Sequence, residues 1–424
     1  MNVFQIKGGN RLQGKVDVAG SKNTALAIMS AVVLAEGETV LHNIPNVSDT
    51  RIKASLLEKF GAIVRWEGTT LYVDCSNMRQ GLADEETVRA IRTSFYLLGP
   101  LMARIGAVEM PAPGGCKIGA RPVDFHLKGL ALLGATVDLS GGVYRASSEG
   151  LKGAEIYLDF PSAGATQHLM TTATLAQGHT IIQNAAMEPE VVALAAFLNC
   201  LGARIQGAGS STITIEGVEK LRGCEFRIPA DRMQAATYLL AGAITKGDIT
   251  VCGILPSDQT PVVNKLREAG AQIEEGHDWI RIVATKRLRA IKVKTMPHPG
   301  FPTDMQQPMA ALLTLANGTS IIDETIYESR HGHVPELERM GANIRIEGRA
   351  AIITGTRKLK GAKVEASDLR AGAALVLAGL AAEGETIVRN IHFIDRGYAE
   401  FEQTLRSLGA EIERVPVASL VDEE

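Results

Sequence analysis

The chain has 424 residues, a formal net charge of −3 and a hydrophobic fraction of 46%, with 43 glycines and few aromatic side chains. This length predicts two or three domains whose cores consist mainly of aliphatic residues. The 44 basic and 47 acidic residues are well mixed, which excludes a global attraction to nucleic acid or to an anionic membrane. Any anion-binding site must therefore be local.

The amino-terminal segment has no charged region followed by an apolar run, and no segment reaches about 18 uninterrupted apolar residues. We therefore expect a soluble, cytoplasmic protein without a membrane partner. The cysteines are odd in number and contain no CxxC pair, so we predict neither a disulfide framework nor a thiolate metal site. They are Cys75, Cys116, Cys200, Cys224 and Cys252.

The first part of the chain predicts a β-α-β-α-β-β unit. Residues 25–35 are apolar on nearly every face, which is typical of a helix buried on all sides, and capping side chains precede them at Ser21. Gly37 ends this helix. A strand at residues 38–44, an amphipathic helix at 48–59 and a hairpin formed by residues 63–66 and 70–73 follow.

A Gly-Ala pair follows a leucine-bearing helical stretch six times, which indicates an internal repeat. The pairs begin at residues 61, 134, 202, 270, 341 and 409, so the spacing is 68 to 73 residues. Five more all-apolar helices are predicted, at residues 94–104, 166–177, 234–246, 305–317 and 369–383.

Six all-apolar helices cannot each face water, so three of them should share one interior that is covered by sheets. This predicts an inside-out α/β fold of two domains with three repeats each. The chain breaks near Ile228-Pro229, and the segment before Ala19 can supply a strand to either domain. We place the first domain at residues 22–229 and the second at residues 1–21 plus 230–424.

Residues 111–124 predict an exposed, shaped loop, because prolines exclude a helix or a central strand and glycines permit positive φ. The loop carries Cys116 next to Lys117 and close to Arg121. Nearby positive charge favours the reactive thiolate, so Cys116 is a candidate acid or nucleophile. The alternative is that Cys116 is a small hydrophobic residue, as lone cysteines usually are.

Equivalent helices in a closed threefold arrangement point the same way, so their amino-termini should gather at one end of each domain. Polar residues occupy these positions, with Lys or Arg close by, and free N–H groups at a helix start bind anions. Each polar residue can also be a simple helix cap. The helix starts are Lys22-Asn23, Thr93-Ser94, Ser162–Thr166, Asp231-Arg232, Thr303-Asp304 and Asp368–Arg370.

Four motifs together resemble the UDP-N-acetylglucosamine 1-carboxyvinyltransferases of the enolpyruvyl transferase family. They are residues 20–26, 114–124, 297–306 and 394–398, and the likeness extends over essentially the whole chain. The fold of that family, two inside-out α/β domains of three repeats, agrees with the fold expected from the repeat.

The resemblance implies that the 3′-hydroxyl of UDP-N-acetylglucosamine attacks C2 of phosphoenolpyruvate and that phosphate is then eliminated, in the first committed step of peptidoglycan synthesis. Cys116 would donate the proton to C3, and Asp304 would be the base. For Asp304, the alternative is a structural cap of the following helix. Lys22 and Asn23 would contact phosphoenolpyruvate, assisted by Arg121 and Arg396 on its phosphate and carboxylate.

The resemblance also implies a nucleotide-sugar site in the cleft between the domains, with no metal or organic cofactor, and alkylation of Cys116 by fosfomycin. The implied nucleotide-sugar contacts are Arg92, Arg121, Pro122, Val123, Asp124, Phe125, Ser162, Ala163, Gly164 and Ile326. The resemblance also implies that three polar residues line the opposite wall of this cleft, namely Arg330, Asp368 and Arg370.

Two stretches depart from the family pattern, residues 229–234 and His331–His333. The main alternative is the shikimate-pathway enolpyruvyl transferase, but its Lys-Ser pair and its Arg-Pro-Met loop are not found here. Another alternative is a non-catalytic paralogue that binds UDP-sugars, although such a protein needs neither a proton donor nor a base. The sequence gives no indication of the oligomeric state.

Overall fold

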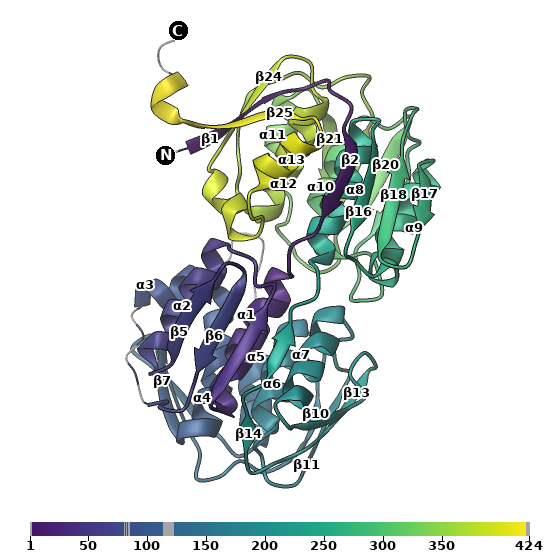
Figure 1. Cartoon of the computed structure of the whole chain (residues 1–424). Coiled ribbons are helices and arrows are strands. Elements are labelled where there is room, and N and C mark those ends of the chain that lie inside the picture. Colours follow the sequence, from purple (N-terminus) through teal and green to yellow (C-terminus); the bar gives the residue numbers. More distant parts are fainter. Residues whose placement is uncertain (1, 80, 82, 84, 113–122, 421–424) are drawn as a thin grey trace. The chain divides into compact units, whose positions relative to one another are not determined.

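The computed structural model describes residues 2–79, 81, 83, 85–112 and 123–420. These residues form two compact units (Figure 1). The first unit contains residues 20–112 and 123–229, and the second contains residues 2–19 and 230–420. The chain therefore leaves the second unit two residues before the boundary that the sequence suggested and re-enters it after Pro229.

Three helices form the interior of the first unit. Every residue of α1 except Asn23 is buried, as expected for a helix that is apolar on all faces. The Ser21 side chain caps α1 by accepting a hydrogen bond from the Thr24 N–H at 3.2 Å. The interior helices are α1 (Lys22–Ala31), α4 (Leu98–Ile105) and α6 (Ala163–Ala173). The others are α2 (Ser48–Lys59), α3 (Glu85–Ala90), α5 (Asp124–Leu132) and α7 (Pro189–Cys200), with 3-10 turns η1 (Val32–Leu34) and η2 (Arg92–Leu97).

Three main sheets surround these helices, and each buries alternate side chains against them. The first has the order β15 (Glu225–Arg227), β4 (Glu38–His42), β6 (Thr70–Asp74), β5 (Ile63–Glu67). The second has the order β10 (Glu155–Tyr157), β11 (His179–Gln183), β13 (Thr212–Glu216), β12 (Arg204–Gln206). The third is β7 (Ala107–Pro111), β9 (Val143–Ser147), β8 (Thr136–Ser140), and β14 (Leu221–Arg222) pairs with β3 (Ala35–Glu36).

The second unit repeats this plan with its own hydrophobic core, and its three interior helices pack against one another. They are α8 (Arg232–Ile244), α10 (Gln306–Leu313) and α12 (Leu369–Ala381). The outer helices are α9 (Thr260–Ala269), α11 (Val334–Arg339) and α13 (Phe401–Ser407). The 3-10 turns are η3 (Pro256–Gln259), η4 (Thr303–Met305), η5 (Ile391–Arg396) and η6 (Val417–Leu420).

The amino-terminal segment supplies two strands to the sheets of the second unit, and Figure 1 shows them in purple beside yellow and green elements. One sheet has the order β23 (Lys363–Glu365), β24 (Glu385–Arg389), β1 (Asn2–Lys7), β25 (Glu411–Pro416). Another has the order β17 (Gln272–Glu275), β18 (Trp279–Val283), β16 (Asp248–Cys252), β2 (Gln13–Asp17). The third is β19 (Lys292–Lys294), β20 (Thr319–Asp323), β22 (Ala350–Thr354), β21 (Asn343–Glu347).

The predicted inside-out α/β fold with three-repeat halves is thus confirmed, with one refinement in two of the buried helices. The predicted helices at residues 94–104 and 305–317 each begin as a 3-10 turn, and the α-helix starts only at Leu98 and at Gln306. Each α-helix carries a proline, Pro100 or Pro308, as its third residue. Proline lacks an N–H and is tolerated only in the first turn, so the α-helix must begin close before it.

The predicted loop at residues 111–124 is shorter at both ends than expected. Pro111 is the last residue of β7, where it lies opposite Val143, and Asp124 is the first residue of α5. Because β7 is an edge strand of its described sheet, a proline without an N–H is tolerated there. The rest of this prediction, including Cys116, Arg121 and Pro122, lies outside the described residues. Among the described helices, none is long and apolar enough to cross a membrane.

Candidate active site

Asp304 in η4 lies between two arginines that are almost completely buried. Arg330 Nη2 donates a hydrogen bond to Oδ1 at 2.8 Å, and Arg370 Nε donates one to Oδ2 at 3.1 Å. The side chains of Arg330 and Arg370 are 3% and 4% exposed, whereas that of Asp304 is 29% exposed. Two adjacent guanidinium groups favour the ionised carboxylate, so Asp304 is held as an oriented anion with an accessible edge.

Arg370 at the start of α12 is itself fixed by a buried hydrogen-bond chain. Its Nη1 donates to the Tyr398 hydroxyl at 3.0 Å, and that hydroxyl lies 2.8 Å from Thr237 Oγ1. The Thr237 hydroxyl donates to the Met233 carbonyl, so the tyrosine must be the donor to threonine. Burial raises the pKa of Tyr398, which keeps this phenol neutral. This series of hydrogen bonds connects α8 with α12 next to Asp304.

Glu324 is a buried anchor of this site that the sequence reasoning missed. It accepts hydrogen bonds from the Thr303 hydroxyl at 2.8 Å and from the Ile326 N–H at 2.9 Å. Arg330 Nη1 donates to the same Thr303 hydroxyl at 2.9 Å. Glu324 therefore fixes both the residue before Asp304 and the backbone of Ile326. It directly follows β20, and a charged residue at the end of an apolar strand was the available signal.

Asp368 and Arg396 occupy two further helix ends of the second unit. Asp368 caps α12 through Oδ1, and its Oδ2 accepts a hydrogen bond from Gln307 at 3.1 Å. Arg396 is the last residue of η5. Its neighbour Asp395 is held by Arg414 through two hydrogen bonds of 2.7 and 2.9 Å. The backbone that carries Arg396 is thus anchored from one side.

In the first unit, α2 fixes the starts of two interior helices. Asp49 Oδ2 lies 3.2 Å from Lys22 Nζ, and both side chains are buried. One turn later, Lys53 Nζ donates to the Thr93 carbonyl at 2.7 Å, directly after Arg92. Burial lowers the pKa of Lys53 well below its usual value. The sequence reasoning found Lys22 and Arg92 but missed these two supports, because contacts between helices do not follow from local patterns.

A histidine pair lies next to Arg92. The Gly99 N–H donates to His168 Nε2 at 2.9 Å, so His168 carries its proton on Nδ1 and donates to His126 Nδ1, also at 2.9 Å. His126, in α5, must then carry its own proton on Nε2. Burial, assisted by the Arg92 charge, lowers the pKa of His126 to about 3. Tyr96 packs against both rings and against Gly164.

The remaining predicted residues of the first unit lie at helix starts as expected. Asn23 is exposed in the first turn of α1, and Val123 precedes Asp124 and Phe125 at the start of α5. Ser162 caps α6, whose first residues are Ala163 and Gly164. Contacts through Tyr96 and His126 bring Arg92, α5 and α6 together. The roles of all these residues remain predictions, and those of Cys116, Arg121 and Pro122 concern positions outside the described residues.

Several buried polar atoms beside Asp368 and Arg330 have no hydrogen-bond partner within the described part of the chain. They are Nε of Arg330, Oε1 of Gln307 and both ring nitrogens of His333. Burial lowers the pKa of His333 to about 3. Such atoms commonly bind ordered water. His331 and His333, which the sequence marked as unusual, therefore form part of the polar surroundings of Arg330.

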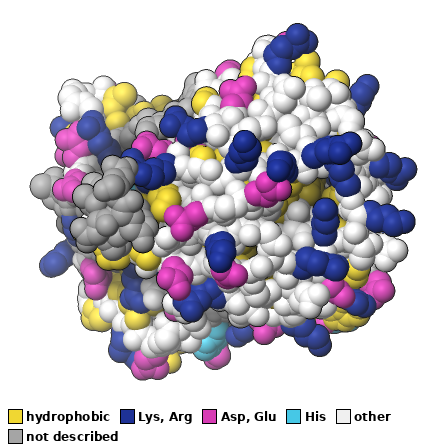
Figure 2. Space-filling model, turned by 90° about the horizontal axis from the view of Figure 1, so that it is seen from above, with side chains coloured by type: hydrophobic (Ala, Val, Ile, Leu, Met, Phe, Trp, Pro, Cys, Tyr) yellow, Lys and Arg dark blue, Asp and Glu magenta, His cyan; other side chains and the backbone are white. Residues whose placement is uncertain are grey.

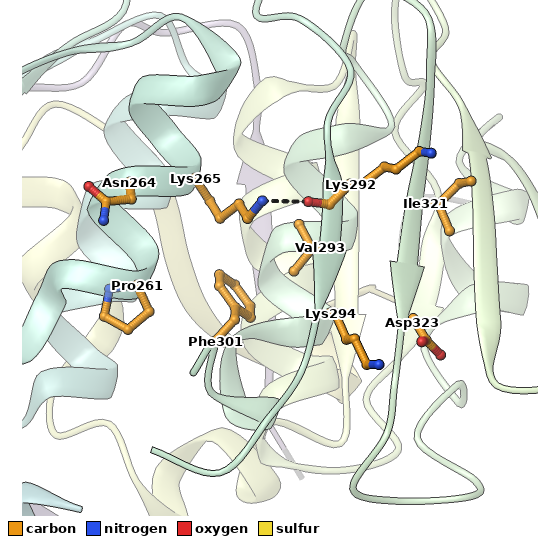
Figure 3. Close-up of a pocket in the computed structure, with 9 residues that line it drawn as sticks. All are labelled: Pro261, Asn264, Lys265, Lys292, Val293, Lys294, Phe301, Ile321 and Asp323. Carbon is orange, nitrogen blue, oxygen red and sulfur yellow. Dashed lines mark hydrogen bonds between the residues drawn. The ribbon is translucent and has the colours of Figure 1, made fainter. Parts of the chain in front are cut away.

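A separate hollow of about 490 Å³ lies in the second unit between α9 and β19 (Figure 3). Lys265 extends across one side of it and donates to the Lys292 carbonyl at 2.7 Å. None of the nine residues around this hollow belongs to the predicted site. They are Pro261, Asn264, Lys265, Lys292, Val293, Lys294, Phe301, Ile321 and Asp323.

On the face shown in Figure 2, Lys and Arg side chains predominate over the right half, and Asp and Glu side chains are mixed with them on the left. Within the described residues, no group of three or more His, Cys, Asp or Glu side chains is arranged to hold a metal ion.

Comparison with known proteins identifies the family. The model of the family EPSP synthase (3-phosphoshikimate 1-carboxyvinyltransferase) matches residues 6–405. The UDP-N-acetylglucosamine 1-carboxyvinyltransferase of Halothermothrix orenii is 48% identical over 415 residues, which cover 98% of this chain and 100% of that protein. The chain belongs to this family of carboxyvinyltransferases. The Carboxydothermus hydrogenoformans protein named UDP-N-acetylglucosamine 1-carboxyvinyltransferase 1 is 49% identical and covers 98% of this chain and 99% of its own length.

Solved carboxyvinyltransferase structures share the fold along almost the whole chain. The enolpyruvyl transferase NikO from Streptomyces tendae has a TM-score of 0.89 at 28% identity and covers 98% of this chain and 99% of its own. EPSP synthase from Acinetobacter baumannii has a TM-score of 0.78 at 20% identity, with 98% and 100% covered. At that identity the second likeness concerns the fold alone. The family assignment made from four motifs is therefore confirmed.

Proposed function

We propose that the protein transfers the enolpyruvyl group of phosphoenolpyruvate to the 3′-hydroxyl of UDP-N-acetylglucosamine, with release of phosphate. The observation that carries this proposal is identity of 46 to 49% along whole chains with proteins that bear the name of this activity. The oriented Asp304 carboxylate supports it, because the reaction needs a group that accepts the hydroxyl proton. The role that follows is a committed step of peptidoglycan synthesis.

The reaction divides into an addition and an elimination. In the addition, the hydroxyl oxygen forms a bond to C2, its proton leaves, and C3 gains a proton. In the elimination, the C2–phosphate bond breaks and C3 loses a proton. Cations must hold the phosphate and the carboxylate throughout, and Lys22, Arg121 and Arg396 have the charge for this. We assign the proton delivered to C3 to Cys116.

Asp304 is proposed as the acceptor of the hydroxyl proton. Its two arginine contacts keep the carboxylate ionised, which is the form that accepts a proton, but they also weaken it as a base. The hydroxyl proton becomes acidic only as the oxygen bonds to C2. We therefore propose that proton transfer to Asp304 accompanies formation of the C–O bond.

A phosphate-release assay tests the function. Phosphate should appear from phosphoenolpyruvate only when UDP-N-acetylglucosamine is present, and Asp304→Asn should abolish turnover. Because Asp304→Asn leaves two buried arginines without a counter-charge, its thermal stability and its binding of UDP-N-acetylglucosamine must be measured as controls. A stable Asp304→Asn variant with full turnover would exclude Asp304 as the base.

A covalent probe tests the assignment of Cys116 separately. Fosfomycin should alkylate the tryptic peptide of residues 105–117 when UDP-N-acetylglucosamine is present, and Cys116→Ala should turn over at a background rate. Detection of that peptide only in unmodified form after long incubation would contradict the assignment, as would full activity of the Ala variant.

The alternative reading is a shikimate-pathway enzyme, as the name of the matching family model suggests. Substituting shikimate 3-phosphate for UDP-N-acetylglucosamine in the same assay separates the two. Phosphate release from phosphoenolpyruvate with shikimate 3-phosphate, but not with UDP-N-acetylglucosamine, would favour the alternative. A non-catalytic paralogue would bind UDP-N-acetylglucosamine and release no phosphate with either acceptor.

A further inference from the structure

Cys200 and Cys224 lie side by side on the first unit, at the end of α7 and directly before β15. Cys224 directly precedes Glu225 in the chain, and the two thiols are close enough to influence each other electrostatically. Cys200 Sγ also donates to the Glu225 carbonyl at 3.6 Å. This contact places the Cys200 sulfur beside the backbone that carries Cys224.

The backbone around the two thiols is held together independently of them. The Arg222 N–H donates to the Leu201 carbonyl at 2.9 Å. One turn before Cys200, the Phe197 ring packs edge-on against Phe226 with centroids 5.4 Å apart. Contacts on both sides of the thiols therefore keep the carboxyl end of α7 against the start of β15. The packing therefore keeps the two cysteines as neighbours.

The two thiols differ in accessibility. Cys200 is exposed, whereas Cys224 is partly buried, and burial together with the Cys200 thiol raises the pKa of Cys224. An oxidant from solution therefore reacts first with Cys200, and Cys224 is the neighbouring thiol that can react next. This order is typical of a thiol with an adjacent resolving cysteine. Among the other described cysteines, Cys75 is buried in the core.

We propose that Cys200 and Cys224 are a reversible dithiol–disulfide site that reacts with small disulfides such as oxidised glutathione. The Cys200 thiolate attacks the glutathione disulfide, forms a mixed disulfide and releases one glutathione thiolate. The Cys224 sulfur, after losing its proton, then attacks Cys200 and releases the second glutathione. The protein pair loses two electrons, and the glutathione disulfide gains them. This site is independent of the proposed transfer reaction.

Oxidation would close a covalent loop over residues 200–224, which contains β12, β13 and β14. A disulfide stabilises mainly by restricting the unfolded chain, and the effect grows slowly with loop length. We therefore expect the thermal midpoint of the oxidised protein to be higher by roughly 5 °C. Reduction with dithiothreitol should restore the original midpoint.

Tryptic digestion can detect the Cys200–Cys224 disulfide directly. Trypsin cuts after Lys152, Arg204, Lys220 and Arg222, so Cys200 and Cys224 fall on separate peptides, residues 153–204 and 223–227. After treatment of the full-length protein with oxidised glutathione, a non-reducing digest should contain these two peptides joined. Dithiothreitol should separate them.

Three variants complete the test. Cys200→Ser and Cys224→Ser should each lose both the joined peptides and the rise in thermal midpoint, and Cys224→Ser should keep a glutathione adduct on Cys200. Cys252→Ser, which removes a partly buried thiol of β16 in the other unit, should retain both effects. If the protein without substitutions gave no joined peptides after treatment, or kept a glutathione adduct, the proposal would be overturned. An equal rise in midpoint in Cys224→Ser would overturn it too.

Discussion

At the scale of single residues, the orientation of Asp304 depends on arginines that come from distant parts of the chain. Arg330 is 26 residues away from Asp304 and Arg370 is 66 residues away. Arg370 contacts both Asp304 and the Tyr398 hydroxyl. The guanidinium makes the two contacts with separate nitrogens, Nε and Nη1, whereas a lysine ammonium has a single nitrogen with which to reach both partners.

We predict that Arg370→Lys lowers kcat by about 10- to 100-fold, because it loses one or two charge-assisted hydrogen bonds worth about 1.5 to 3 kcal/mol each. Steady-state kinetics of phosphate release, together with a separate measurement of UDP-N-acetylglucosamine affinity, would measure the loss. Arg389→Lys is the matched control, since Arg389 forms only an exposed ion pair with Glu365 at 3.7 Å. An unchanged kcat in Arg370→Lys would show that the Asp304 geometry does not depend on the Arg370 guanidinium.

His333 predicts a pH dependence of stability. Burial lowers its pKa to about 3, whereas an unfolded histidine titrates near 6.5. Between these values the unfolded chain binds a proton that the folded chain does not, so stability falls as the pH falls from about 6.5 toward 3. The slope is about 1.4 kcal/mol per pH unit. We expect His333→Leu to reduce the loss between pH 6.5 and pH 5 by about 2 kcal/mol.

Urea denaturation at several pH values, followed by Trp279 fluorescence in a Trp66→Phe background, would test this in the second unit. Exposed His277→Leu serves as the control and should keep the full slope. If His333→Leu and the parent lost stability equally between pH 6.5 and pH 5, the buried imidazole would not be the source of the effect.

At the scale of elements, Arg414 in β25 connects four parts of the second unit. It donates two hydrogen bonds to Asp395 in η5 and two to Glu402 in α13, at 2.7 to 3.2 Å. Its guanidinium also lies 4.9 Å from the Phe4 ring centroid in β1. This arrangement holds the turn that ends at Arg396.

We predict that Arg414→Met raises KM for phosphoenolpyruvate by about tenfold, because the backbone of Arg396 loses its support, and lowers stability by about 1 to 3 kcal/mol. Kinetics and urea denaturation would measure the two effects. Arg281→Met is a well-matched control: Arg281 makes two 2.8 Å hydrogen bonds to Asp248, but on the surface. A KM as low as that of the control would mean that η5 holds its shape without Arg414.

Elements whose signals are local could be predicted well, and contacts between elements could not. The capping residues and apolar stripe predicted a helix at residues 48–59, and α2 spans Ser48–Lys59. The helix starts at Lys22, Ser162 and Asp368 also followed from capping chemistry. The hydrogen bonds that hold these helix starts in place form only after the helices pack. Examples are the bond from Lys53 to the Thr93 carbonyl and the bond from Thr303 to Glu324.

At the scale of the whole molecule, the two units have separate hydrophobic cores. The chain has two tryptophans, Trp66 in β5 of the first unit and Trp279 in β18 of the second. Each tryptophan therefore reports on one core. The repeat spacing predicted this division of the chain into three-repeat halves. We placed residues 1–21 with the second half, although the segment before Ala19 could supply a strand to either.

We predict that Ile28→Ala, which truncates a fully buried side chain of α1, destabilises the first unit by about 2 to 5 kcal/mol. The unfolding midpoint seen by Trp66 in a Trp279→Phe background should then fall more than the midpoint seen by Trp279 in a Trp66→Phe background. Leu375→Ala in α12 should reverse the order. Equal shifts at both tryptophans would show that the two cores unfold as one cooperative structure.

The position of β1 and β2 has a consequence for biosynthesis. Gln5 bonds to Glu385, 380 residues later, and Arg11 bonds to the Lys246 carbonyl, 235 residues later. At about 5 to 20 residues per second, a ribosome needs on the order of tens of seconds to deliver these partners. β1 and β2 must therefore remain unpaired while residues 20–229 are synthesised, and β1 can complete its pairing only after β25 has been made.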